Sequence, residues 1–320
     1  MSCYVGIDIG GMSAKCAVLR DGQLYGVSRC KTAREYSAEE TADRIVALAK
    51  EAVQKSGVTL QEVAAVGIGS PGIIDSAKGV VVSWTNYNWQ NVPLGELIKD
   101  KLTKPCYILN DANSAALGEY EYGAGKQYHS TVMITIGTGI GSGIVFDGKI
   151  FEGNQGAGGE LGHEVIRFGG EKCSCGRRGC FERYASARAL IHQTQKAMII
   201  HPESELWRIC NANAENANGK TVFDGLRLGD RTAKSVLDRY IKYLAAGITN
   251  AVNAFRPEAV ILGGGISAEG ETITKPLQAI VNREKMGGSF SASVQIVTAM
   301  LGNDAGIYGA AEYARRKAEC

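Results

Sequence analysis

The sequence contains no stretch typical of a leader peptide or a membrane span. Its N-terminus, MSCYVGIDIGG, lacks the basic flank and the long apolar core of a signal peptide. The longest apolar region, residues 132–146, is too short to span a bilayer and is interrupted by glycines. With 35 basic and 33 acidic residues, there is also no charge excess to attract a polyanion or a membrane surface. We therefore expect a cytoplasmic protein that binds neither nucleic acid nor membranes.

Three common site motifs are also missing. No segment matches the P-loop pattern G-x-x-x-x-G-K-[ST]. A Rossmann fingerprint places its glycines between a strand and a helix, whereas GTGIGSG at 137–143 runs into IVFDGKIF, a second strand-like segment. The C-x-x-C spacing of thioredoxin-like redox centres does not occur. A phosphate loop in this chain would therefore be a β-hairpin turn.

The cysteines that are present point to a metal site. There are nine, an odd number, and in a reducing compartment disulfides are disfavoured. Cys173, Cys175 and Cys180 cluster in EKCSCGRRGCFE, and clustered thiols commonly bind zinc. We expect His163 of GGELGHEV as the fourth ligand; an aspartate or glutamate is less typical, and three free, half-buried thiols are the alternative. Three thiolates and an imidazole leave no open position for water, so the zinc would be structural.

Two related segments indicate an internal repeat. The first begins at Val5 (VGIDIGGMSAKCAVLRDGQLYG) and the second at Val132 (VMITIGTGIGSGIVFDGKIFEG). Each has alternating apolar residues, a glycine turn, a second apolar run and an Asp-Gly pair, which is a strong hairpin signal. A chain of 320 residues is long enough for two domains. We therefore expect two domains that each begin with the same β-meander.

The rest of the chain alternates between helical and strand-like patterns, which indicates an α/β architecture. Helices are expected over residues 39–55, 112–122, 233–255 and 305–316, and strands over 63–68 and 106–110. AVILGGG at 259–265 is expected to be a buried strand that ends in a glycine turn. The polar stretch 201–220 is expected to be an irregular surface loop.

Three glycine turns follow predicted strands: DIGG at 8–11, GTGIGSG at 137–143 and GGG at 263–265. Glycine lets the backbone approach a phosphate so that its amides donate to the oxygens. The alternative for each glycine turn is that its glycines only allow the chain to turn tightly. Asp8 lies in the first turn, where a carboxylate can hold Mg²⁺ directly or through water.

Seven motifs together resemble the ROK family (repressors, open reading frames and kinases). They are GIDIGG, SPGIID, NDAN, TIGTGIGSGIV, GGELGH, CSCGRRGCFE and VILGGGIS, in the family's order along nearly the whole chain. The stretch NYNWQNVPL is most similar to the family's bacterial glucokinases. The resemblance implies an actin-like ATPase (ribonuclease H-like) fold in which two α/β domains close over a cleft for sugar and ATP. It places the small domain at 1–115 plus 304–320 and the large domain, with the zinc loop, at 116–303, and it implies a homodimer or homotetramer.

The resemblance also implies a role for each matching residue. Asp111 would be the base that takes the proton from the sugar hydroxyl. The residues that would hold the sugar are Gly72, Asn110, Glu160, His163 and Glu182. The residues that would line the nucleotide site are Gly10, Gly11, Thr138, Gly139, Gly264 and Gly265. The zinc ligands would be His163, Cys173, Cys175 and Cys180. Taken singly, each side chain has a plainer explanation: Asp111 as a helix cap, Asn110 as a turn residue, Glu160 and Glu182 as surface charges, and His163 as a core histidine.

The function that follows from the resemblance is ATP-dependent phosphorylation of a hexose, with glucose and its 6-hydroxyl as the first choice. The alternatives are N-acetylmannosamine, N-acetylglucosamine, fructose, allose or a β-glucoside as substrate. The family's repressors carry an N-terminal helix-turn-helix, for which the first strand near Cys3 leaves no room. Met12 stands where the family usually has threonine and cannot donate a hydroxyl hydrogen bond, so a non-catalytic sugar sensor is a further alternative.

Overall fold

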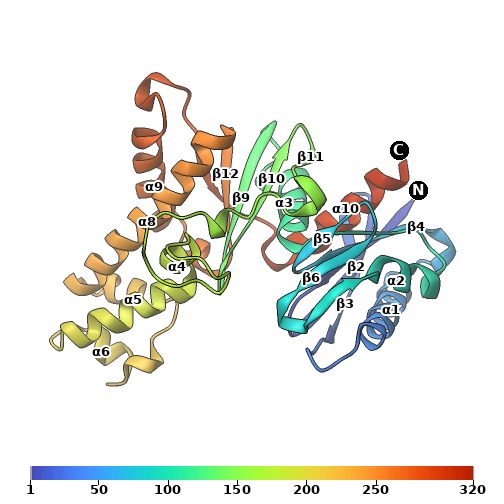
Figure 1. Ribbon diagram of the computed structural model, residues 1–320, viewed down its shortest axis with the longest axis horizontal. Helices are drawn as coiled ribbons and strands as arrows, with labels where there is room; N and C mark the ends of the chain where they lie inside the picture. The colour runs from blue at the N-terminus through green and yellow to red at the C-terminus, as the bar shows by residue number, and fades with distance from the viewer. Residues whose placement is uncertain (1, 320) are drawn as a thin grey trace. The chain divides into compact units, whose positions relative to one another are not determined.

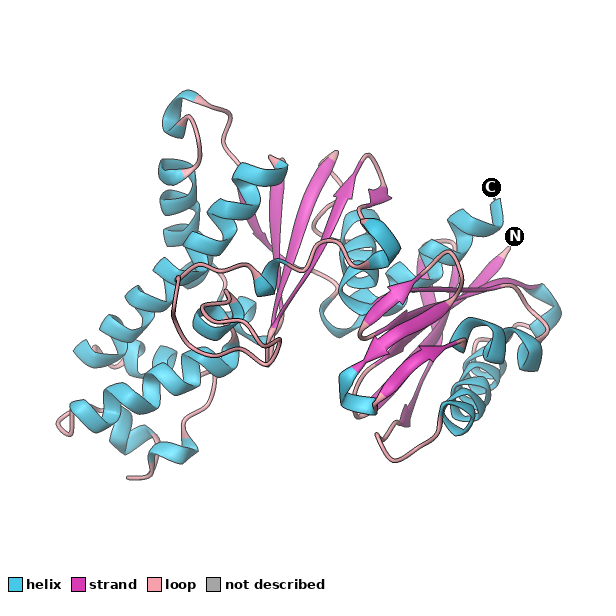
Figure 2. Ribbon diagram, in the orientation of Figure 1, coloured by secondary structure: helices cyan, strands magenta, loops and turns pink. Residues whose placement is uncertain are grey.

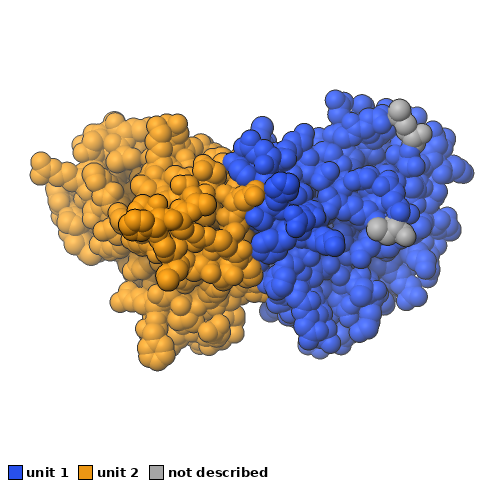
Figure 3. Space-filling view, turned by 90° about the horizontal axis from the view of Figure 1, so that it is seen from above, with its two compact units in different colours: residues 1–131, 143–159, 300–320 blue, residues 132–142, 160–299 orange. Residues whose placement is uncertain are grey.

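The computed structural model describes residues 2–319 and divides the chain into two compact units (Figures 1 and 3). Unit 1 comprises residues 1–131, 143–159 and 300–320, and unit 2 comprises residues 132–142 and 160–299. The helix at 111–122 packs against the C-terminal helix and therefore belongs to unit 1. The predicted domain boundaries stay a prediction, because compact units defined by contacts need not coincide with folding domains.

The core of unit 1 is a five-stranded sheet in the order β3-β2-β1-β4-β8. Its strands are β1 (Cys3–Ile9), β2 (Ser13–Arg20), β3 (Gln23–Lys31), β4 (Val63–Ser70) and β8 (Cys106–Asn110). β1 pairs antiparallel with β2 and parallel with β4, and β4 pairs parallel with β8. These strands confirm the predicted buried segments at 63–68 and 106–110.

Helices cover both faces of this sheet (Figure 2). They are α1 (Ala38–Lys55), α3 (Asp111–Tyr122) and α10 (Ala305–Glu319), close to the predicted ranges. Successive side chains of a strand point to opposite faces, so Val5 and Ile7 share a core with α1 while Tyr4 packs with α10. α10 lies so close that a Cβ on Gly6 would come within 2.2 Å of the Ile307 carbonyl oxygen. Glycine is required at that contact.

A small antiparallel sheet completes unit 1. It consists of β5 (Ile73–Asp75), β6 (Val80–Trp84) and β7 (Trp89–Val92), and α2 (Leu94–Leu102) follows it. Three buried aromatic side chains pack on one another here: Trp84 stacks on Tyr87 with ring centroids 3.7 Å apart, and Trp89 meets both edge-on. We call these three side chains the aromatic cluster.

The second five-stranded sheet repeats the topology of the first. Its order is β11-β10-β9-β12-β13, so in each sheet the first three strands form a meander and the next two are added beside its first strand. The strands are β9 (Ser130–Ile136), β10 (Ile140–Phe146), β11 (Lys149–Ile150), β12 (Ala259–Gly263) and β13 (Gln295–Thr298). The Asp-Gly pairs at 21–22 and 147–148 have positive φ at both residues, as a type I′ hairpin turn requires. The predicted repeat is confirmed.

Unit 2 is otherwise largely helical. Its helices are α4 (Glu182–Ala185), α5 (Ala187–Ile200), α6 (Leu206–Ile209), α7 (Thr221–Arg227), α8 (Arg231–Phe255) and α9 (Glu271–Glu284). The prediction of an irregular loop at 201–220 is partly wrong, because α6 forms there and buries Leu206. A four-residue helix is too short for the spacing of its apolar side chains to distinguish it from a loop.

Short 3₁₀ helices connect these elements at Leu60–Glu62, Thr85–Tyr87, Asn154–Gly156, Leu161–His163, Ala214–Asn216, Gly265–Glu269, Gly288–Phe290 and Gly302–Asp304. Within residues 2–319, no helix is both long and apolar enough to cross a membrane.

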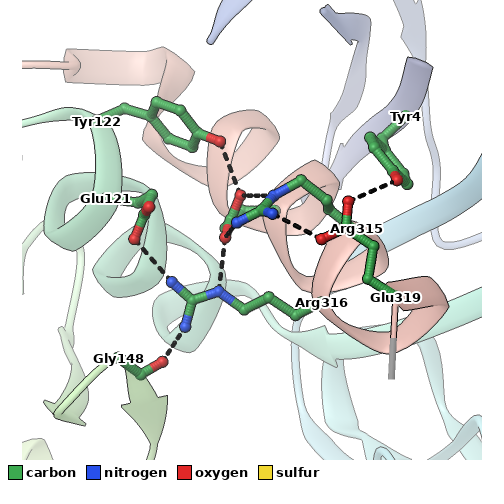
Figure 4. Close-up of polar contacts among 8 residues, drawn as sticks. Tyr4, Glu121, Tyr122, Gly148, Arg315, Arg316 and Glu319 are labelled. Carbon is green, nitrogen blue, oxygen red and sulfur yellow. Dashed lines mark hydrogen bonds and ion pairs between the residues drawn. The ribbon is translucent and has the colours of Figure 1, made fainter. Parts of the chain in front are cut away.

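A buried carboxylate anchors α10 in unit 1 (Figure 4). Glu312 is fully buried and accepts hydrogen bonds from Tyr122 of α3 and from Arg315 and Arg316 of its own helix, at 2.6–2.9 Å. Arg316 also donates to Glu121 and to the Gly148 carbonyl at the tip of the β10–β11 hairpin. Burial alone would raise the pKa of Glu312, but the hydrogen bonds from the two arginines and the tyrosine outweigh it and hold that pKa below 4.5.

We expect Glu312→Gln to lower the free energy of unfolding of unit 1 by about 3 kcal/mol, because it leaves two guanidinium groups without their buried counter-charge. Since the pKa of Glu312 is lower in the folded than in the unfolded chain, its contribution is complete above pH 4.5 and is lost as the pH falls further. Urea unfolding at pH 7 and pH 4 measures both effects. Glu319→Gln is the control: its side chain is 51% exposed, and it should cost under about 1 kcal/mol.

Candidate active site

The predicted site residues come from both units. Those in unit 1 are Asp8, Gly10, Gly11, Gly72, Asn110 and Asp111. Those in unit 2 are Thr138, Gly139, Glu160, His163, Cys173, Cys175, Cys180, Glu182, Gly264 and Gly265.

In unit 1 the topology brings the predicted residues to one edge of the first sheet. β1, β4 and β8 are parallel, so their carboxyl ends lie at the same edge. Asp8 lies near the end of β1, Gly72 follows β4, and Asp111 directly follows β8. This edge is where open α/β sheets usually bind ligands.

Asp8 is the most perturbed carboxyl group at this edge. Burial, and then the negative charge of Asp111, raise the pKa of Asp8 to about 6, and the positive charge of Lys15 only partly offsets them. Its carboxyl group lies against the first turn of α10, where a Cβ on Gly306 would come within 2.7 Å of the Asp8 Cγ. Two carboxylates that repel each other in a partly dehydrated place favour a bound cation.

Lys15 belongs to this group, although the sequence did not single it out. It stands opposite Asp8 in the β1–β2 register, and its ammonium group forms an ion pair with Asp304 just before α10. The hairpin register is the signal that points to it, because residues directly opposite on paired strands share a face. The ion pair with Asp304 follows only from the packing of the C-terminal segment.

Asn110 has a structural task at the site. Its side-chain oxygen accepts hydrogen bonds from the Ala112 and Asn113 amides, so it is the N-cap of α3. Its side-chain nitrogen donates to the Gly72 carbonyl at 3.0 Å, which leaves one N–H for another partner. Asp111 is thus the first residue of the helix, and the N-cap position proposed for it is occupied by Asn110. Gly72 has φ +97°, and a Cβ there would meet the Ser83 carbonyl oxygen at 2.2 Å.

In unit 2 the second and third glycine turns meet at the end of β9. A Cβ on Gly264 would come within 2.2 Å of the Ile136 carbonyl oxygen, and Gly264 has φ +90°. Gly139 lies in the β9–β10 turn, where a Cβ would come within 2.5 Å of a Glu182 carboxylate oxygen. Thr138, in the same turn, is exposed, and Gly265 has open space where a Cβ would stand.

The four predicted zinc ligands form one cluster. The ligand atoms of His163, Cys173, Cys175 and Cys180 all lie within 4.8 Å of one another. Zn–S and Zn–N bonds of about 2.3 and 2.0–2.1 Å give tetrahedral edges of about 3.8 Å between two sulfurs and about 3.6 Å between sulfur and nitrogen. The Cys175 and Cys180 sulfurs are 3.6 Å apart, and the Cys173 sulfur is 3.6 Å from His163 Nδ1. The donor set and its spacing both fit a tetrahedral zinc ion.

Glu182 joins this cluster to the second glycine turn. The Cys173 thiol donates to one Glu182 oxygen at 3.0 Å, while the other oxygen lies beside Gly139. Glu160 is exposed, and its carbonyl accepts from the His163 amide at 3.0 Å. In the cluster, His163 turns Nδ1 toward Cys173, so its other ring nitrogen is the one available to a further partner.

Two α/β sheets of the same strand order, with glycine turns at their strand ends, define the class of the protein: it has the two-domain actin-like ATPase (ribonuclease H-like) fold. The ROK family pattern matches residues 4–317, and the chain belongs to the ROK family.

Named relatives fall into two groups. The glucokinase of Thermotoga maritima is 36% identical over 315 residues, which cover 98% of this chain and 97% of that protein. The crystal structure of a ROK family glucokinase from Streptomyces griseus, in complex with glucose and AMPPNP, matches with a TM-score of 0.82 at 33% identity and covers 98% of this chain and 100% of that chain. The xylose repressor of Caldicellulosiruptor bescii is 34% identical over 243 residues, which cover 76% of this chain but only 60% of the repressor.

Proposed function

We propose that the protein is an ATP-dependent sugar kinase that transfers the γ-phosphoryl group of ATP to the 6-hydroxyl of glucose. The observation that carries the proposal is the pair of interacting carboxyl groups, Asp8 and Asp111, at the ligand-binding edge of unit 1. Full-length similarity to glucokinases supports glucose as the substrate. The similarity to the repressor covers a smaller part of both chains than the similarity to the glucokinases does. It therefore supports a non-catalytic sugar sensor less than the similarity to the glucokinases supports a kinase.

Asp111 is the proposed general base. A sugar hydroxyl is a poor nucleophile, and a carboxylate that accepts its proton as attack begins contributes about 10²–10⁴-fold to the rate. Asn110 orders the start of α3 and so holds Asp111 at the end of β8. Glu160, His163 and Glu182 are the proposed sugar ligands from unit 2, since carboxylate and imidazole groups suit hydroxyls that both donate and accept.

Asp8 and the glycine turns form the proposed nucleotide site. Asp8 fits Mg²⁺, because a hard cation prefers carboxylate oxygens and would relieve the repulsion from Asp111. Mg²⁺ held by Asp8 would supply positive charge that offsets the negative charge of the ATP phosphates. The amides of Gly10, Gly11, Thr138 and Gly139, with Gly264 and Gly265, are the proposed phosphate and nucleoside contacts.

The cysteine cluster is the proposed structural zinc site. Zinc bound by His163, Cys173, Cys175 and Cys180 would fix the orientation of the His163 ring and, through Cys180 two residues earlier in the chain, the position of Glu182; both are proposed sugar ligands. The thiols require a reducing compartment, which is consistent with the proposed cytoplasmic location. A homodimer or homotetramer is part of the same proposal and rests on the family alone.

ADP release in a coupled assay, with ATP and Mg²⁺ over a panel of sugars, tests the function. We expect turnover with glucose to exceed that with N-acetylmannosamine, N-acetylglucosamine, fructose, allose and a β-glucoside. A clear preference for one of those sugars would replace glucose as the substrate while the kinase assignment stands. If no sugar on the panel supports ADP release, yet glucose binds in calorimetry, the protein is a sensor and the kinase proposal is wrong.

A further inference from the structure

We propose that Thr32 and Tyr87 are positioning residues that aim the amides of the first glycine turn at the phosphates of ATP. The inference rests on the proposed function of that turn and goes beyond it, because neither side chain lies in the turn. Thr32 follows β3, and Tyr87 ends the 3₁₀ helix between β6 and β7. The turn connects β1 to β2 through Gly10, Gly11 and Met12.

Each hydroxyl donates to a carbonyl of the turn. Thr32 Oγ1 donates to the Gly10 oxygen at 2.8 Å, and Tyr87 Oη donates to the Gly11 oxygen at 3.3 Å. Both donors are buried, with exposures of 5% and 4%. The contact from Tyr87 is longer than the usual range of about 2.5–3.0 Å for an O–H···O bond, so we expect it to be the weaker of the two.

Holding a carbonyl also sets the direction of an amide. In a planar trans peptide the C=O and the following N–H point in opposite directions. Thr32 and Tyr87 thus turn the Gly11 and Met12 N–H groups away from themselves. Among residues 2–319, the recorded hydrogen bonds of the turn are Gly10 N–H to the Ser13 oxygen and the contacts made by Thr32 and Tyr87; none gives the Gly11 or Met12 amide an acceptor. Two adjacent amides without a partner are what a phosphate oxygen requires.

The two donors are themselves rigid. The Tyr87 ring is clamped in the aromatic cluster between Trp84 and Trp89, and a packed ring loses little entropy when its hydroxyl bonds. The Thr32 amide donates to the Met12 carbonyl at 3.2 Å, so the same residue holds the turn by main chain and side chain. Two residues that lie outside the turn therefore hold its peptide planes in one orientation before any phosphate binds.

This arrangement gives a physical account of Met12. Its side chain is 84% exposed and has no hydroxyl to offer to a phosphate. With the peptide planes already held by Thr32 and Tyr87, the turn can bind phosphate through backbone amides alone. The side chain at position 12 is then free to vary.

The test compares Thr32→Val and Tyr87→Phe with the wild-type protein. Each removes one hydroxyl and keeps the shape of the side chain. We expect the KM for ATP and the Kd for AMPPNP to rise about threefold to tenfold for Thr32→Val and about twofold to fivefold for Tyr87→Phe. The KM for glucose should stay within twofold. Tyr25→Phe is the matched control, since the Tyr25 hydroxyl donates to Gln23 of the same strand, β3, and the variant should change neither constant.

Unchanged AMPPNP affinity in both variants overturns the inference, and so does an equal loss of glucose and nucleotide affinity together with a lowered melting temperature, which marks a merely structural role. Thr32→Ser, which restores the hydroxyl, should return the affinity toward the wild-type value. The proposed function is judged separately: wild-type protein that binds AMPPNP but releases no ADP contradicts the kinase and leaves the affinity comparison intact.

Discussion

Replacing Asp111 by asparagine is expected to lower kcat for glucose phosphorylation about 10²–10⁴-fold while the Kd for glucose changes less than about threefold. Asparagine keeps the size of the side chain but cannot accept the hydroxyl proton. The N-cap of α3 is supplied by Asn110, so the helix should form normally in the variant. Steady-state kinetics with saturating ATP and glucose calorimetry measure the two quantities.

The control for this change is Glu96→Gln, which neutralises an exposed carboxylate in the first turn of α2. It should leave kcat within twofold. A kcat for Asp111→Asn within tenfold of wild type would show that another group accepts the proton. An equal loss of sugar affinity and kcat would instead assign Asp111 to binding the sugar.

Replacing Cys175 by serine is expected to release zinc and to raise the KM for glucose at least about tenfold. A serine hydroxyl stays protonated and is a poor zinc ligand, so the tetrahedral set loses one of its thiolates. Without the ion, the loop loses the anchor that orients the His163 ring and that, through Cys180, positions Glu182 beside Gly139. Mutating a group that merely supports a metal ligand typically costs about 10–100-fold in metal affinity or activity, and Cys175 is itself a proposed ligand. Metal analysis of the purified protein and glucose kinetics give the two readouts.

Ser174→Ala is the matched control, since it changes an exposed side chain between two of the ligands. It should retain one zinc per chain and normal kinetics. Wild-type affinity for glucose in the zinc-free Cys175→Ser protein would refute the role of the metal in shaping the sugar pocket. Retention of zinc by that variant would show that the ligand set is different.

The carboxyl groups at the proposed phosphate site lower the stability of the folded chain. Asp8 is half-buried beside a second carboxyl group, and its raised pKa means that the ionised form is disfavoured there. Lys15 offsets the repulsion only in part, because Asp304 competes for its charge. Unfavourable electrostatics of this kind are typical of sites made to bind a charged ligand.

The sequence by itself predicted the repeat, the hairpins and the grouping of three cysteines in one loop. Asp-Gly pairs specify a type I′ turn, since both residues must adopt positive φ, and the alternating apolar residues around them set the register. Cys173, Cys175 and Cys180 are separated by so few residues that their loop must bring the sulfurs together. These features are local, and local chemistry is enough to predict them.

Only the tertiary structure decided which distant groups act on them. Asn110 donates to the Gly72 carbonyl across 38 positions of sequence, Lys15 pairs with Asp304, and Tyr87 reaches the Gly11 carbonyl across 76 positions. Such contacts depend on where whole elements pack, and packing responds to the summed shape and burial of many side chains. No short-range pattern in the sequence encodes that sum, so these partners could be found only in the folded chain.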